Sequence, residues 1–175
     1  MSASIDRLAL AFWEICRLRL GPKDLPDSGF LFRCVLTSYV LLGAGINLIG
    51  FAAAEAWALS ITMTVLLLVT TQALLLIRGY PRRMQQTATA IMGTQIVLFA
   101  PALALRYWFH LIERAESQSA LAGYFWLGLF VWELFISAHI LRHALNTRLL
   151  VSFFISVAYV FLEFRVLYFV HYAFK

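Results

Sequence analysis

The chain has 175 residues, of which 62% are hydrophobic and 13% are charged, and its formal net charge is +5. Soluble domains carry roughly a quarter charged residues, and one of this length leaves about a third of its unfolded-chain surface in contact with water. The composition therefore excludes an ordinary soluble domain and predicts an all-α, polytopic transmembrane helical bundle. The basic residues form short clusters between apolar runs, which leaves no basic face for nucleic acid.

Residues 1–29 are predicted to form a cytoplasmic segment, with an amphipathic helix over 4–20 and a turn rich in Pro and Gly after it. Apolar residues recur at helical spacing on one face, from Leu8 through Phe12 to Ile15. We expect this helix to lie on the inner membrane surface or to dock on the spans. Glu14 interrupts the apolar run that a signal peptide needs, so we do not expect the helix to be a cleaved leader.

Residues 30–175 are predicted to form the transmembrane helical bundle, with five apolar stretches that can each cross a hydrocarbon core of about 30 Å. Basic residues mark the segment before the first span and the connections after the second and fourth, whereas the other connections carry few or cancelling charges. The positive-inside rule then predicts a cytoplasmic N-terminus and a periplasmic C-terminus in a bacterial inner membrane. The spans are expected near residues 30–54, 56–77, 88–109, 121–141 and 146–169.

Stripes of small residues predict where two spans approach their neighbours, because small side chains let helix backbones come close in lipid. One stripe falls on the first span and one on the third, where Pro101 is expected to kink the helix. The predicted packing residues are Gly43, Asn47, Gly50 and Ala54 in the first span and Gly93, Ala100 and Ala104 in the third.

Glu133 lies near the middle of the fourth span, where an ionised acid costs a few kcal/mol on insertion scales unless it is paired or protonated. We therefore expect its side chain to face protein. Two interpretations stay open: a proton or cation site, and a neutral acid that forms a hydrogen bond between helices.

The fifth span carries a polar face made of Ser152, Ser156, Tyr159 and Glu163, at spacings of i, i+4, i+7 and i+11. On an apolar helix such a face predicts contact with the bundle interior or with a partner subunit. Arg165 follows two residues after Glu163, so it is predicted to lie on another face and to extend towards the outer headgroups.

The depth of Glu163 and Arg165 depends on where the fifth span begins. A start at Leu145 leaves both near the outer interface, where they need no special role. A start at Leu149 places both deeper in the membrane, where a polar side chain points more strongly to function.

Histidines near the outer surface allow a haem interpretation. His110 and His171 lie on different spans and are weak candidates for the two axial ligands of a b-type haem. His139 and His143 share one helix, which does not complete a four-ligand pattern. Because interfacial histidines are commoner than ligands, no cofactor and no metal site is predicted.

Enzymatic equipment is not evident in the sequence. It contains no nucleophile elbow, phosphate loop or paired catalytic carboxylates. Cys16 and Cys34 have neither the spacing of a zinc site nor that of a disulfide framework. The connecting segments are also too short to build a soluble active site, so we expect the protein not to be an enzyme.

The approach to the first span contains Gly21-Pro22 and Asp24-Leu25-Pro26, between the N-terminal segment and five spans that end outside. In this layout the chain resembles small bacterial Yip1-like membrane proteins. The resemblance covers the whole chain in topology and only this approach in residues, so it transfers no functional residue. It implies a non-enzymatic membrane protein that organises other membrane components.

The leading functional hypothesis is an accessory or scaffolding subunit of a larger membrane complex, with membrane lipids and other membrane subunits as its partners. The alternative is a small proton-coupled transporter or channel-like protein that uses Glu133 and the polar face of the fifth span. Five spans without internal duplication disfavour the inverted-repeat design of many transporters. A b-type haem or quinone-binding subunit is a third hypothesis.

Overall fold

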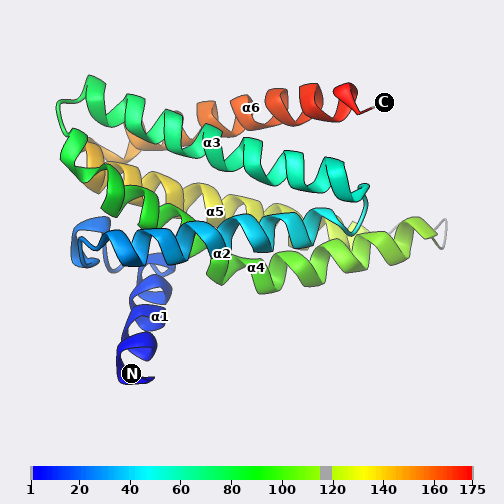
Figure 1. The fold of residues 1–175 in the computed structure, drawn as a ribbon, viewed down its shortest axis with the longest axis horizontal. Helices are drawn as coiled ribbons and strands as arrows, with labels where there is room; N and C mark the ends of the chain where they lie inside the picture. The colour runs from blue at the N-terminus through cyan, green and yellow to red at the C-terminus, as the bar shows by residue number, and fades with distance from the viewer. Residues whose placement is uncertain (1, 115–119, 175) are drawn as a thin grey trace.

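The computed structural model describes residues 2–114 and 120–174, with the side chains of 6–112 and 120–174. Over the described residues the chain is helical and has no strand, which confirms the predicted all-α bundle (Figure 1). Five of the helices are long and apolar enough to cross a membrane, so this is a multi-pass membrane protein. The elements are α1 (Ser2–Cys16), η1 (Pro22–Asp24), α2 (Gly29–Asn47), α3 (Ala53–Ile77), η2 (Pro81–Arg83), α4 (Met84–Arg114), α5 (Ala120–Leu145) and α6 (Leu149–Ala173).

The five spanning helices form a closed ring. Helix α2 packs on α3 and α4, α3 packs on α6, and α5 packs on both α6 and α4. Figure 1 shows these helices running along the long axis of the molecule, whereas α1 lies across that axis. This crosswise direction is the one that an interfacial helix takes when its neighbours span the bilayer.

Local chemistry fixes the ends of several spanning helices. Ser28 caps α2, with its Oγ accepting a hydrogen bond from the backbone N–H of Leu31 at 3.3 Å. Helix α3 ends before Gly79, whose φ of 77° is a conformation that glycine adopts without strain. Asn146 adopts φ 52° after α5, and this left-handed residue turns the chain towards α6.

The C-terminal half of α1 docks on α4 and α5. Phe12, Ile15 and Cys16 are buried, and the indole Nε1 of Trp132 donates a hydrogen bond to the Cys16 carbonyl at 3.0 Å. The ring of Phe12 lies against Gly93, where any Cβ would collide with it. Burial raises the pKa of the Cys16 thiol to about 11. The predicted amphipathic helix is therefore anchored by its apolar face to the spans.

Helix α1 ends at Cys16 rather than near residue 20. Leu18 adopts φ 61°, which breaks the helix before Gly21. Arg17 and Arg19 both reach back to the carboxylate of Glu14, at 3.1 and 3.5 Å.

The first span is shorter than predicted, because α2 ends at Asn47 rather than near residue 54. Gly50 consequently lies in the turn, against the guanidinium of Arg106, and Ala54 belongs to α3. Gly43 does lie at a helix contact, where a Cβ would come 2.9 Å from Ser60 Oγ of α3.

The predicted stripe on the third span is only partly internal. Gly93 is buried, but its neighbour is Phe12 of α1 rather than another span. Ala100 and Ala104 are exposed on α4, so they do not form the predicted packing contact between described helices. Pro101 lies within α4, which continues past it and changes direction near its middle (Figure 1).

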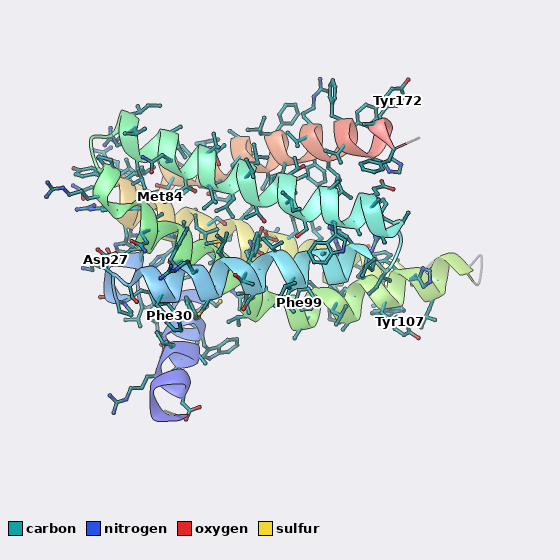
Figure 2. The ribbon with its side chains drawn as sticks, viewed as in Figure 1. Asp27, Phe30, Met84, Phe99, Tyr107 and Tyr172 are labelled. Atoms are coloured by element: carbon teal, nitrogen blue, oxygen red, sulfur yellow. The ribbon has the colours of Figure 1, made fainter. Side chains whose placement is uncertain are left out.

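The two ends of the bundle differ in charge. We name the basic end as the one where α2, α4 and α6 begin, and the far end as the opposite one. Figure 2 shows Asp27 and Met84 at the basic end, and Tyr107 and Tyr172 at the far end. Basic side chains collect in the segments that meet at the basic end, namely Lys23, Arg33, Arg78, Arg82, Arg83, Arg142 and Arg148.

The docking of α1 can be tested through the reactivity of Cys16, with Cys34 replaced by Ser. We expect Cys16 to resist a maleimide at neutral pH in the folded protein, because its thiol is buried and mainly protonated. Gly93→Ala should release α1 and expose the thiol, since overpacking of this kind costs about 1–3 kcal/mol. Gly123→Ala is the matched control, because a Cβ there meets nothing within 4 Å. Equal labelling of both variants would contradict the docked position of α1.

Candidate functional site

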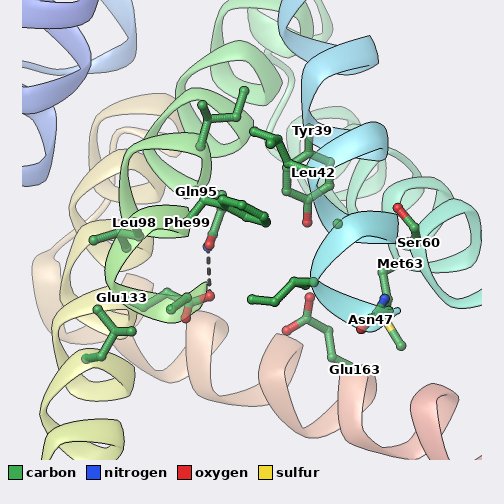
Figure 3. Close-up of a pocket in the computed structure, with 15 residues that line it drawn as sticks. Tyr39, Leu42, Asn47, Ser60, Met63, Gln95, Leu98, Phe99, Glu133 and Glu163 are labelled. Carbon is green, nitrogen blue, oxygen red and sulfur yellow. Dashed lines mark hydrogen bonds between the residues drawn. The ribbon is translucent and has the colours of Figure 1, made fainter. Parts of the chain in front are cut away.

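A cavity of about 240 Å³ lies inside the ring and is lined by residues from all five spanning helices (Figure 3). Much of its wall is apolar, including Leu42, Met63 and Phe99. Polar groups nevertheless enter from every helix. They are Tyr39 and Asn47 of α2, Ser60 of α3, Gln95 of α4, Glu133 of α5 and Glu163 of α6.

Glu133 is held at the cavity by one hydrogen bond between helices. The Gln95 amide Nε2 donates to Glu133 Oε1 at 2.7 Å, drawn as the dashed line in Figure 3. Among the described residues, the other carboxyl oxygen has no hydrogen-bond partner. The hydrogen bond between helices is therefore compatible with a proton or cation site, because Gln95 fixes one carboxyl oxygen and the other is available to a proton or a cation.

Glu163 enters the same cavity from α6. That helix begins at Leu149, the deeper of the two starting points considered from the sequence. In Figure 3 the carboxyl groups of Glu133 and Glu163 both point into the pocket. Arg165 is exposed, so it does not neutralise either acid from within the cavity.

The polar face of α6 points inward along its length. Ser152 and Ser156 are buried, and Ser156 Oγ donates to the Ser152 carbonyl at 3.0 Å. Ser152 Oγ also hydrogen-bonds Thr147 Oγ1 at 2.7 Å, so this serine joins the helix to the preceding turn. Tyr159 is different, because its buried hydroxyl forms no well-aligned hydrogen bond within the described part of the chain, although it lies beside the Glu163 carboxyl.

Two further spaces adjoin the same pair of acids. One of about 60 Å³ extends from them past Tyr39 and Tyr159 to Ser156. The other, about 250 Å³, reaches the acids between apolar side chains of α5 and α6, such as Phe130 and Phe164. Glu133 and Glu163 therefore stand where three spaces meet.

The charge in these spaces is one-sided. The described residues that line them include two carboxyl groups and no Lys, Arg or His. Two carboxylates that face one poorly solvated cavity repel each other, and the repulsion is stronger than in water because the local dielectric is lower. A shared proton or a bound cation removes that repulsion.

None of the histidines is among the described residues that line these spaces. His171 Nδ1 pairs with Glu55 Oε1 at the far end, beside the Phe51 ring, and no described contact joins it to His110. His139 Nε2 donates to the Leu20 carbonyl at 3.0 Å and so holds the segment after α1. Within the described ranges, no three His, Cys, Asp or Glu side chains group as a metal site requires.

Sequence reasoning found the two acids and missed part of their setting. Tyr39, Ser60 and Gln95 were not singled out, although Gln95 interrupts an apolar run in the third span and is the strongest available signal. Asn47 was assigned to helix packing and instead lines the cavity. Pairing Gln95 with Glu133 required knowing that α4 and α5 are neighbours.

Comparison with known proteins adds no relative: no family model, no curated protein and no solved structure matches this chain. Any function must therefore be argued from the cavity itself. Its chemistry is defined by two acids and an apolar wall inside a membrane-spanning ring, with the Tyr159 hydroxyl in the adjoining space of about 60 Å³.

The bond from Gln95 to Glu133 can be tested by Gln95→Leu, which removes the donor at nearly constant volume. We expect the protein in detergent to lose about 1 kcal/mol of stability, the scale of hydrogen bonds between membrane helices. Gln72→Leu on α3 is the control, because no side-chain hydrogen bond of Gln72 is found among the described residues. Thermal unfolding followed by circular dichroism measures both, and equal midpoints would count against the bond.

Proposed function

We propose that this protein is a small membrane transporter that binds a cation inside the ring of helices and exchanges it for a proton. The observation that carries the proposal is that Glu133 and Glu163 face one intramembrane cavity, and none of the described residues that line it is basic. Intramembrane acids that face a cavity are typical of proton and ion pathways.

The wall of the cavity favours a small organic cation over a bare metal ion. A metal ion of the hard type needs about six oxygen ligands, whereas much of this wall is hydrocarbon. Tyr39 and Phe99 supply aromatic rings, which attract ammonium groups through their faces. A volume of about 240 Å³ restricts the ligand to a compact amine.

Proton exchange follows from the pairing of the acids. An empty cavity is more stable with one carboxyl protonated, because repulsion between two carboxylates is then absent. A bound monovalent cation compensates one negative charge, so its entry allows the shared proton to leave. One cation entering and one proton leaving keeps the charge of the site unchanged.

The orientation belongs to the same proposal. We place the basic end in the cytoplasm and the far end in the periplasm of a bacterial inner membrane, as the positive-inside rule predicts. Asn47 and Ser60 then extend the polar lining from the acids towards the periplasmic side, because Asn47 ends α2 and Ser60 lies in the first turns of α3.

Transport can be measured with purified protein in liposomes that contain a pH-sensitive dye. A gradient of methylammonium, tetramethylammonium, Na⁺ or K⁺ should drive proton movement for at least one of these ions. Glu133→Gln and Glu163→Gln should each reduce it about tenfold or more, the effect of losing about 1.4 kcal/mol of charge pairing. Glu14→Gln on α1 is the matched control and should keep full activity. Absence of flux in the unmodified protein, or equal flux in all variants, would contradict the proposal.

Tyr159 gives a second test, because its hydroxyl lies beside the Glu163 carboxyl and forms no well-aligned hydrogen bond to a described residue. Tyr159→Phe should leave the unfolding midpoint unchanged or raise it, since an unsatisfied buried hydroxyl is removed. Affinity for the transported ion should still fall about fivefold, as for one lost hydrogen bond. A lower midpoint with unchanged affinity would assign the hydroxyl a purely structural role.

A separate observation supports the accessory-subunit hypothesis. An apolar groove of about 510 Å³ opens between α4 and α5, with Ala104 and Gly128 in its lining beside Trp108 and Phe125. Small residues such as these let the backbone of another membrane helix approach closely. We propose this groove as the contact for a partner subunit, the role that the Yip1-like resemblance implies. Native mass spectrometry of protein from its own membranes would detect such a partner, and a lone chain would contradict it.

A further inference from the structure

A second cavity lies at the basic end, away from the two acids. Its volume is about 450 Å³, and three segments that are distant in sequence form it. They are the turn after α1, the start of α4, and the end of α5 with the following loop. The lining residues used here are Lys23, Arg83, Arg142, His143, Asn146 and Thr147.

Positive charge in this cavity is largely uncompensated. Lys23, Arg83 and Arg142 line it from three separate segments, and no described ion pair involves any of them. No Asp or Glu is among its described lining residues. The neighbouring acid, Asp24, accepts a hydrogen bond from the backbone N–H of Gly21 at 2.8 Å and stabilises the turn.

The architecture joins the segments that carry these cations. Arg83 Nη1 donates to the Ala144 carbonyl at 3.0 Å, which joins η2, just before α4, to the end of α5. The Gln86 amide donates to the Leu25 carbonyl at 3.0 Å and fixes the turn after α1 to α4. Gly21 lies against the His143 ring so closely that a Cβ would approach it to 3.2 Å. These contacts bring three like charges together although they repel.

We propose that this cavity binds the phosphate group of an anionic ligand, whose charge offsets the three cations. Guanidinium and ammonium groups from different directions are the donors that phosphate oxygens prefer. The amide of Asn146 adds a neutral donor at the same site. The volume exceeds that of a bare ion and falls within the usual range of small-molecule sites, roughly 300–1,000 Å³.

Two sources can supply this phosphate. The cavity lies where the spanning helices begin and end, which is the level of the lipid headgroups, and basic pockets between spanning helices bind anionic phospholipids. A soluble phosphate compound from the adjacent aqueous phase carries the same group. This site is distinct from the cavity at Glu133 and Glu163, so the phosphate proposal does not depend on the transport proposal.

Native mass spectrometry in a neutral detergent tests the site, with phosphatidylglycerol, phosphatidylcholine or inorganic phosphate added to the delipidated protein. We expect phosphatidylglycerol to bind more tightly than phosphatidylcholine. The double variant Lys23→Ala/Arg142→Ala should weaken this binding on the order of fivefold for each removed charge. Arg78→Ala/Arg82→Ala is the matched control, because it removes equal charge at the same end outside the cavity.

The outcomes separate the sources. If phosphatidylglycerol binds selectively and an excess of inorganic phosphate of about tenfold does not displace it, the site is assigned to a lipid headgroup. Direct binding of inorganic phosphate, or its displacement of the lipid, assigns it to a soluble compound. Absence of both, or equal loss in the two double variants, overturns the proposal. If Lys23→Ala/Arg142→Ala does not fold, the single variant Lys23→Ala, at an exposed residue, is compared with Arg82→Ala. Lys23→Ala should then weaken phosphatidylglycerol binding more than Arg82→Ala does, and equal binding overturns the proposal.

Discussion

The bundle is organised by one solvation requirement, which is to keep two carboxyl groups inside spanning helices where lipid offers them no hydrogen bond. Glu133 and Glu163 meet it by turning into the ring rather than towards the hydrocarbon. This choice sets the rotation of α5 and α6 about their axes. It also explains why Gln95 faces α5 from an otherwise apolar part of α4, since its amide supplies a donor that lipid lacks.

The elements outside the ring fasten it at one end. The Phe12 ring of helix α1 packs against the backbone at Gly93. Trp132 and His139 donate hydrogen bonds to the carbonyls of Cys16 and Leu20, at the end of α1 and just after it. The segment after α1 is thereby held beneath α4 and α5, together with its lysine. The cavity lined by Lys23, Arg83 and Arg142 therefore includes this docked segment, whereas the cavity at Glu133 and Glu163 is lined by the spanning helices.

The pattern of the sequence predicts most of the architecture, because hydropathy and length alone mark a spanning helix. The inward face of α6 also follows from spacing, since Ser152, Ser156 and Tyr159 recur at helical intervals. The end of α2 was missed because apolar residues continue through the turn to Ala54. Ala100 and Ala104 share a stripe with Gly93, yet they are exposed, because periodicity identifies a face without identifying what covers it. Convergence of side chains from five helices is a property of the ring, and no local pattern encodes it.

The central claim is that residues 133 and 163 face the same cavity, and cysteine cross-linking in lipid bilayers tests it most directly. In a protein without its native cysteines, Glu133→Cys/Glu163→Cys should be joined by a short bifunctional thiol reagent within one chain. Glu133→Cys/Arg165→Cys should not be joined, because residue 165 lies on α6, as residue 163 does, but on an exposed face of that helix. Cross-linking of the second pair in preference to the first would contradict the account.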